Sequence, residues 1–175
     1  YMINMMIKIC KKTHDAEKAV KLFKQLEDLN FEPNVIYFNS IIYALSSRRD
    51  YASQAVDMYN KMKLMKVTPN IETLTSVLSA TSKIGDIYTA NEIIKELKFL
   101  GYSVDSHIIN MLIKTYSAAI KNQPSQETID KYLNDTWKLY DYAIEKGIKI
   151  NTYILNAMIE VYSSANKIVE LEGLI

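Results

Sequence analysis

A short pattern of residues recurs five times along this chain of 175 residues. Its most regular form is the string YFNSII around Asn39, and the related strings are MINMMI, TLTSVL, IINMLI and ILNAMI. The central polar residue falls at positions 4, 39, 75, 110 and 156, so that successive copies are 35, 36, 35 and 46 residues apart. A recurrence of about this length indicates a repeat architecture, because each unit must stack on its neighbours to bury its apolar face.

Two further sequence patterns recur with nearly the same spacing as the first. The string AVKLF, which begins at Ala19, is echoed by AVDMY from Ala55, by ANEII from Ala90 and, more loosely, by TWKLY from Thr136. The tripeptides EPN and TPN close the first two repeats. Three markers with a common spacing are hard to obtain by chance, so the repeat is a firm property of this sequence.

Each repeat reads as two amphipathic helices. In the second helix apolar residues fall at i, i+3, i+4 and i+7, as in Ala19, Leu22, Phe23 and Leu26. Helix-stopping residues separate the repeats: Pro33, Pro69, Gly101 and Gly147. The predicted fold class is therefore all-α, an α-solenoid of stacked antiparallel helix-turn-helix repeats in a right-handed superhelix with a concave groove.

The predicted domain is a single array over residues 1–175. Its repeats are expected at 1–34, 35–70, 71–105, 106–151 and 152–175, and the incomplete first and last repeats are typical of a piece of a longer array. The fourth repeat holds 11 more residues than the third, in or near residues 120–132. Within that stretch, residues 122–125 predict a loop, and Ser125 is a suitable first residue for an extended second helix.

Charge and reactive side chains limit the function classes. Lys and Arg number 21 against 20 Asp and Glu, a net charge of +1, so nucleic-acid binding would require basic groups gathered on one face. The single cysteine, Cys10, excludes an internal disulfide and is interpreted as a core residue. His14 and His107 lie too far apart in sequence to suggest a metal pair, and Trp137 is expected to pack within its helix.

The sequence contains no Ser/His/Asp set, glycine-rich phosphate loop or carboxylate cluster with metal-ligand spacing. We therefore expect neither an enzyme nor a cofactor. No apolar run approaches the roughly 20 residues of a membrane-spanning helix, so no membrane partner is expected.

The 34-residue tetratricopeptide repeat is a competing interpretation, but its Trp-x-x-Leu-Gly-x-x-Tyr pattern is absent from every first helix. Residues 35–42, VIYFNSII, with the closing TPN of the same repeat, resemble instead the P-type motif of the pentatricopeptide repeat (PPR) family. That motif opens in the manner of VVTYNTLI and closes on Pro-Asp or Pro-Asn. The resemblance covers essentially the whole chain, most strongly in the first three repeats, and implies a protein that binds single-stranded RNA with one base per repeat.

In this family the fifth and last residues of a motif contact one base, and the second residue helps to sandwich it. The resemblance implies base contacts from Asn4 with Asn34, Asn39 with Asn70, Thr75 with Asp105, Asn110 with Asn151, and from Asn156. The sandwiching residues would be Tyr1, Ile36, His107 and Tyr153, while Glu72 at the same position of the third repeat places an anion beside the RNA path. By the family's pairing rule the order from 5′ to 3′ is pyrimidine, pyrimidine, guanine, pyrimidine, which agrees with the donors and acceptors of these side chains.

Basic residues near the turns between helices are candidates for phosphate contacts: Lys11, Lys12, Arg48, Arg49 and Lys83. The resemblance further implies a mitochondrial or plastid location, an organellar mRNA or rRNA as partner, and a role in RNA processing, stability or translation. Other proteins of a ribonucleoprotein complex are a second expected class of partner. The alternative is a structural scaffold, such as an organellar ribosome-associated subunit, that grips RNA or protein without reading bases.

Overall fold

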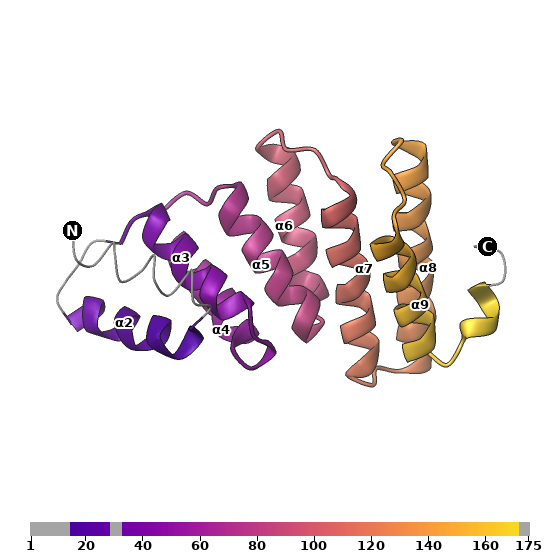
Figure 1. The fold of residues 1–175 in the computed structure, drawn as a ribbon, viewed down its shortest axis with the longest axis horizontal. Helices are drawn as coiled ribbons and strands as arrows, with labels where there is room; N and C mark the ends of the chain where they lie inside the picture. Colours follow the sequence, from indigo (N-terminus) through magenta and orange to yellow (C-terminus); the bar gives the residue numbers. More distant parts are fainter. Residues whose placement is uncertain (1–14, 29–32, 172–175) are drawn as a thin grey trace. The chain divides into compact units, whose positions relative to one another are not determined.

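The computed structural model describes residues 15–28 and 33–171. All the regular secondary structure in these two ranges is helical (Figure 1). The α-helices are α2 (Ala16–Asp28), α3 (Val35–Ser46), α4 (Ala52–Leu64), α5 (Ile71–Ile84), α6 (Ile87–Phe99), α7 (Ser106–Lys121), α8 (Gln126–Glu145) and α9 (Thr152–Ser164). Two 3₁₀ turns, η1 (Arg49–Tyr51) and η2 (Ile168–Leu171), follow α3 and α9. The expected all-α class of paired helices is confirmed.

The chain forms two compact units, an N-terminal half (residues 1–81) and a C-terminal half (residues 82–175). In the N-terminal half, α3 packs against both α2 and α4 and is buried along almost its whole length. Ile41, Ile42 and Leu45 are each at most 1% exposed, and Tyr59 and Met62 of α4 are fully buried. The 3.6-residue periodicity of the sequence therefore corresponds to the faces that these helices bury.

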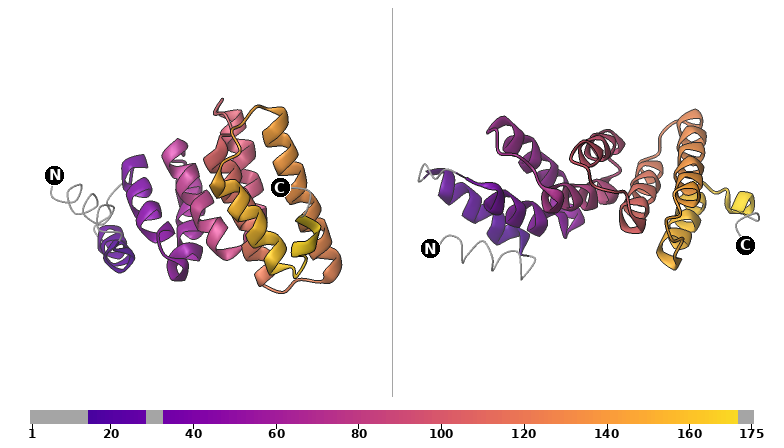
Figure 2. Two further views of the ribbon diagram at one scale, coloured as in Figure 1. Left: turned by 45° about the vertical axis from the view of Figure 1, so that its right-hand side comes forward. Right: turned by 90° about the horizontal axis from the view of Figure 1, so that it is seen from above.

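In the C-terminal half, α7 packs against α6, α8 and α9, and α8 and α9 run alongside each other in both views of Figure 2. Ile113, Met158 and Tyr162 lie in the core cluster of this half. Trp137 packs against that cluster, with its ring centroid 6.2 Å from that of Tyr162, as expected of a packing residue. Burial raises the pKa of Tyr116 and of Tyr162 to about 12.

The additional residues of the fourth repeat lengthen both of its helices. Helix α7 has 16 residues and α8 has 20, whereas α3 and α4 have 12 and 13. A short loop joins them where the sequence predicts one, and the Ser125 hydroxyl begins α8 by accepting a hydrogen bond from the Thr128 amide at 3.3 Å.

Asparagine or aspartate begins each first helix of a described repeat. The side-chain oxygen accepts a hydrogen bond from the amide three residues later, at 2.9–3.1 Å, and the four capping residues are Asn34, Asn70, Asp105 and Asn151. These are the residues predicted to stand last in a repeat and to contact bases. Helix capping is thus one reason for their presence that does not depend on any ligand.

A residue in the left-handed backbone conformation follows each of the second helices α4, α6 and α8. Lys66, Gly101 and Gly147 have φ angles of 58°, 79° and 65°. The amide of the next residue then donates a hydrogen bond back into the last turn, as Tyr102 does to the Leu97 carbonyl at 2.9 Å. Glycine adopts this conformation without strain, whereas Lys66 does so at a cost of about 1 kcal/mol.

Gly85 allows an unusually close approach of two backbones in the C-terminal half. A Cβ atom on this residue, whose φ is 77°, would lie 2.5 Å from the backbone nitrogen of Ala119 in α7. The Asn122 side chain donates a hydrogen bond to the Ile84 carbonyl at 2.9 Å beside this contact. The position of α7 therefore depends on the absence of a side chain at residue 85.

Ile159 departs from the pattern of buried apolar pairs on the first helices. Ile42, Leu78 and Ile113 are fully buried, but Ile159 of α9 is 51% exposed. The part of the chain that the structure describes contains no first helix after α9, so no neighbour covers this side chain. None of the described helices has both the length and the hydropathy needed to cross a bilayer.

Candidate nucleic-acid interface

Asn39 and Asn70, which are 31 residues apart in sequence, are joined by a hydrogen bond in the N-terminal half. The Nδ2 atom of Asn39 donates to Oδ1 of Asn70 at 3.0 Å and to Oε2 of Glu72 at 3.1 Å. Its Oδ1 atom accepts from the Thr73 hydroxyl at 2.5 Å. The structure thus brings together the two residues that the sequence assigns to one base, and we call these four residues the second site.

Thr73 completes the second site and was missed by sequence reasoning. Thr73 is fully buried. Its hydroxyl also accepts a hydrogen bond from the backbone N–H of Asn70 at 3.1 Å, and its own backbone N–H donates to Asn70 Oδ1 at 3.0 Å. The signal was present in the repeats, because the corresponding position holds Tyr37, Ile108 or Ile154 elsewhere. A short hydroxyl side chain that is buried at a position held elsewhere by a large aromatic or aliphatic residue indicates a buried polar partner.

Glu72 contacts the repeat before its own. The sequence places this carboxylate beside the RNA path of the third repeat, whereas in the structure it is half-buried and bonded to Asn39 of the second. The first turn of α5 explains this difference, because it brings the carboxylate and the capping Asn70 to the same amide of Asn39.

The predicted guanine pair is divided between the two halves, with Thr75 in the N-terminal half and Asp105 in the C-terminal half. The Thr75 hydroxyl donates to the Ile71 carbonyl at 2.8 Å, within its own helix. Asp105 is exposed and caps α7, with Oδ1 accepting from the Ile108 amide at 2.9 Å. Each side chain therefore has a local structural role near the beginning of the first helix of its repeat.

The C-terminal half contains a second predicted pair, Asn110 and Asn151. Asn151 caps α9 by accepting from the Ile154 amide at 3.1 Å. Asn110 is half-buried, and its Oδ1 atom is buried without a hydrogen-bond partner among the described residues. We call Asn110, Asn151, Tyr153 and Ile154 the fourth site, because they occupy the repeat positions of Asn39, Asn70, Glu72 and Thr73.

The predicted sandwiching residues are open to solvent. Ile36 at the start of α3 is 57% exposed, Tyr153 at the start of α9 is 69% exposed, and His107 on α7 is also exposed. Exposed large apolar side chains at these positions are suited to stacking on a base. Asn156 on α9 is exposed as well. Tyr1, Asn4, Cys10, Lys11, Lys12 and His14 lie outside the described residues.

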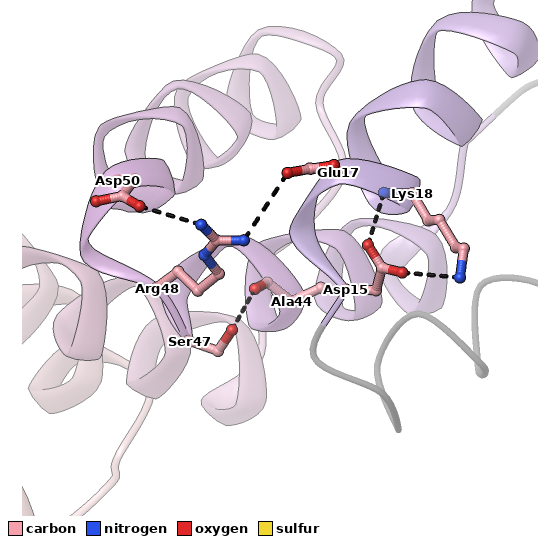
Figure 3. A network of polar contacts seen from close by, with 7 residues as sticks. All are labelled: Asp15, Glu17, Lys18, Ala44, Ser47, Arg48 and Asp50. Atoms are coloured by element: carbon pink, nitrogen blue, oxygen red, sulfur yellow. Dashed lines mark hydrogen bonds and ion pairs between the residues drawn. The ribbon is translucent and has the colours of Figure 1, made fainter.

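Arg48 has local partners that compete with a phosphate role (Figure 3). Its guanidinium lies 3.1 Å from Asp50 and 4.0 Å from Glu17, and it stacks over the Tyr51 ring with 5.1 Å to the centroid. Two carboxylates reduce the positive potential that this side chain offers to an anion. Arg49, the neighbouring candidate, is exposed.

Lys83 stands in the C-terminal half close to another cation. Burial lowers the pKa of its ammonium, and the charge of Lys114 lowers it further. Two like charges near each other, one of them half-buried, favour an anion between them. Lys121 is different, since its ammonium lies 2.5 Å from the Glu160 carboxylate and is neutralised there.

A cavity of about 300 Å³ opens between α6, α7 and α8 in the C-terminal half. Its lining is mainly apolar, including Ile94, Leu112 and Tyr142, and Asp135 and Lys138 form an ion pair of 3.1 Å at its side. The described residues contain no group of three His, Cys, Asp or Glu side chains that could hold a metal ion.

Residues 2–131 match the family model described as the pentacotripeptide-repeat region of PRORP. The chain belongs to the pentatricopeptide repeat family. Curated relatives in Arabidopsis thaliana include the pentatricopeptide repeat-containing protein At3g22690, which is 26% identical over 133 residues, or 75% of this chain and 15% of the relative. Another, At5g48730, is named chloroplastic and is 27% identical over 158 residues, or 90% of this chain and 29% of the relative.

This PPR chain therefore spans less than a third of the length of these two relatives. A further relative, At1g07590, is named mitochondrial and is 24% identical over 115 residues, or 62% of this chain and 22% of the relative. Names of both organelles thus occur among the proteins that it resembles.

Solved structures share the fold at low sequence identity. The PPR domain of Arabidopsis thaliana protein-only RNase P 1, in complex with tRNA, has a TM-score of 0.72 and 16% identity, with 97% of this chain and 84% of that chain covered. Nuclear proteinaceous RNase P 2 from the same organism has a TM-score of 0.73 and 13% identity, with coverages of 97% and 36%. PPR10 in complex with an 18-nucleotide psaJ RNA has a TM-score of 0.54 and 20% identity, with 96% and 29% covered.

Proposed function

We propose that this PPR chain binds single-stranded RNA and that each repeat contacts one base. The observation that carries the proposal is the bond between Asn39 and Asn70 at 3.0 Å. Two amides from successive first helices meet at one point, beside the exposed Ile36, so that a base stacked there would find both amides within reach. The RNA complexes of the PPR domain of RNase P 1 and of PPR10 support RNA as the class of ligand.

The amides and the carboxylate suggest which bases fit. An asparagine amide both donates and accepts, so the pairs at the second and fourth sites suit pyrimidines. Asp105, with Thr75, would accept hydrogen bonds from the N1–H and N2–H groups of guanine. The proposed reading remains pyrimidine, pyrimidine, guanine, pyrimidine, in which Asn4 and Asn34 provide the first pyrimidine.

The organellar part of the proposal rests on the relatives. Those named chloroplastic or mitochondrial support a location in a plastid or mitochondrion, where the RNA partner would be an organellar mRNA or rRNA. Processing, stabilisation or translation of that RNA are the roles we propose. Other proteins of a ribonucleoprotein complex are the second proposed class of partner.

The similarity to RNase P bears on catalysis. A segment with this fold covers 36% of the chain of RNase P 2, which is an enzyme, so the absence of catalysis is proposed only for this segment's own residues. The described part holds no three-residue metal cluster. We propose that the segment contributes binding.

Filter binding with short single strands tests the proposal. The chain is expected to bind a 12-nucleotide RNA with CCGC or UUGU at its centre at least fivefold more tightly than the same strand with purines in place of the pyrimidines. Double-stranded RNA of the same sequence serves as a control, because its bases are hidden from these side chains. Equal affinity for the pyrimidine and purine strands would remove the base-reading proposal.

A scaffold that grips RNA or protein without reading bases is the second candidate. It is favoured by the balanced net charge of +1 and by the two carboxylates beside Arg48, which reduce its positive potential. Salt dependence separates the two candidates. A groove that neutralises several phosphates loses affinity steeply between 50 and 200 mM salt, whereas a scaffold with few phosphate contacts shows a shallow slope.

A further inference from the structure

We propose that the cavity between α6, α7 and α8 is a docking site for an amphipathic helix of a partner protein, with large apolar side chains on one face and carboxylates beside them. All three helices belong to the C-terminal half. The site lies outside the predicted base contacts, so its existence does not depend on base reading. It provides a surface and a chemistry for protein partners.

The cavity is built by two second helices that stand on one first helix. Helix α7 packs against both α6 and α8, and the cavity of about 300 Å³ lies between the three helices. Its most buried lining residues belong to α7: Ile109, Leu112 and Tyr116, each at most 8% exposed. This volume lies at the small end of the range of ligand pockets and offers room for a large apolar side chain.

The two walls of the cavity have the spacing of helix faces. Ile94 and Lys98 of α6 are four residues apart. On α8, Asp135, Leu139 and Tyr142 follow one another at i, i+4 and i+7. Residues at these spacings form a ridge along one face of a helix. A helix that lies in the groove between two such ridges would place its own side chains at i, i+3 and i+4 into the cavity.

Apolar surface continues from the cavity toward the loop between α6 and α7. Lys98 and Val104 line the cavity, and the chain between them carries Phe99, Leu100 and Tyr102. These three side chains are 88%, 39% and 39% exposed. Exposed apolar groups next to a cavity are typical of protein–protein contacts, in which aromatic residues are enriched. RNA fits this surface poorly, because its phosphates would lose water against apolar side chains.

The charged lining residues favour an acidic partner. Lys98 lies with its ammonium 5.5 Å from the centre of the Tyr142 ring and has no ion pair within the described part of the chain. Lys138 is paired with Asp135 but stays 66% exposed. Two lysines against one aspartate leave the cavity with a charge of +1. A carboxylate on the partner would therefore pair with Lys98 while a neighbouring apolar side chain fills the cavity.

The cavity and the predicted base contact of this helix lie on different sides of α7. Leu112 follows Asn110 by two residues, so their side chains point about 160° apart around the helix. A helix docked against Leu112 would not cover Asn110. The chain should therefore bind a protein segment and an RNA at the same time.

Phage display of random peptides of about 12 residues, roughly three helical turns, tests the docking site on the purified chain. We expect the selected peptides to share large apolar residues three or four positions apart and a net negative charge. Labelled copies of the selected peptides then give affinities by fluorescence anisotropy. Ile94→Trp, which fills the cavity, should weaken their binding about tenfold or more. Lys98→Glu, which reverses the exposed charge, should weaken it about fivefold.

The N-terminal half provides matched controls. Lys63 of α4 occupies the repeat position of Lys98 and also lies over a tyrosine ring, that of Tyr59. Leu64, next to it, is 83% exposed. Lys63→Glu and Leu64→Trp should therefore leave peptide affinity within about twofold of the unchanged chain. Should Ile94→Trp not fold, as judged by circular dichroism, the surface variant Lys98→Glu decides.

The possible results separate this docking site from the proposed RNA binding. A saturating peptide should change the affinity for the CCGC strand less than twofold, and peptide binding should persist even if the chain does not distinguish pyrimidines from purines. The docking site is wrong if no acidic apolar pattern is selected, or if the selected peptides bind both cavity variants as tightly as the unchanged chain. It is also wrong if Lys98→Glu weakens RNA binding but not peptide binding, or if sedimentation shows a dimer that Ile94→Trp dissociates, because the occupant is then RNA or a second copy of the chain.

Discussion

The second and fourth sites contain the same pair of asparagines in two different states. At the second site, Asn39 is held by Asn70, Glu72 and Thr73. At the fourth, Oδ1 of Asn110 is buried without a partner among the described residues. The difference follows from one position, because Ile154 has no hydroxyl to donate where Thr73 has one.

This comparison shows that the two residues of a predicted base-contacting pair do not set the hydrogen-bonding state of a site by themselves. Their neighbours in the following first helix decide whether the amide is already bonded or waiting for a partner. A buried acceptor without a hydrogen bond costs free energy in the absence of a ligand. The fourth site is therefore the one in which a bound base would repair an existing defect, whereas at the second site it must break a bond.

The largest effect is expected from disturbing the helix that carries Asn110. Gly85→Ala should destabilise the chain by about 3 kcal/mol or more, because the added Cβ would meet the backbone of Ala119 at 2.5 Å and the residue has a φ of 77°. Gly101→Ala is the matched control, since its φ is 79° but no atom lies within 4 Å of the added Cβ. It should cost only about 1 kcal/mol. Urea denaturation of both variants measures the difference, and equal losses would show that the close approach is unimportant.

A smaller effect should distinguish the two asparagines directly. Asn39→Ala is expected to cost about 2 kcal/mol, because it removes three hydrogen bonds and leaves the buried Thr73 hydroxyl with fewer partners. Asn110→Ala should change the free energy of unfolding by less than about 0.5 kcal/mol, because it also removes an unsatisfied oxygen.

Chemical denaturation measures the free energy of unfolding of Asn39→Ala and of Asn110→Ala. Filter binding of the CCGC strand measures the RNA affinity of the same two variants. Both variants should weaken RNA binding despite their different stabilities. If Asn110→Ala were as destabilising as Asn39→Ala, the fourth site would hold a structural partner in solution, and the contrast between the sites would disappear.

The smallest effect concerns the ion pair between α7 and α9. The Lys121 ammonium donates to Glu160 and holds the pKa of that carboxyl below its usual value of 4.5. A carboxyl with a lowered pKa in the folded state adds stability above its unfolded pKa and loses it as the pH falls through the folded value. Because both side chains are 44% exposed, the contribution should be only about 0.3–0.5 kcal/mol.

Glu160→Gln should therefore lower the free energy of unfolding slightly at pH 7, and this difference should disappear as the pH falls through the lowered pKa of Glu160. Stability measured at pH 7 and pH 3 in parallel checks this expectation. The Arg48–Glu17 pair of the N-terminal half, which is longer at 4.0 Å, should contribute less, and Glu17→Gln provides the matching variant. A larger loss of stability on Glu17→Gln than on Glu160→Gln would contradict this ranking of the two ion pairs.

Much of the fold could be read from the sequence. The apolar periodicity predicted the paired helices, and the loop before Ser125 with its extended second helix is where the sequence expected it. The glycine positions 101 and 147 predicted helix ends, since those ends need a left-handed residue. Lys66 takes the same conformation without being a glycine, and Gly85 has its role only because α7 comes close to it. These last two features give no signal in a local pattern.

The candidate site divides in the same way. The resemblance to PPR motifs was enough to pair Asn39 with Asn70, because both stand at fixed positions of the motif. That Glu72 reaches back to the preceding repeat, and that Thr73 completes the network, was decided by the tertiary structure. Hydrogen bonds of about 3 Å depend on how the start of α5 is placed against α3, and no periodicity specifies that placement. The repeat thus determined the fold and the positions that are predicted to face a ligand, whereas packing between first helices decided which of those side chains already have partners.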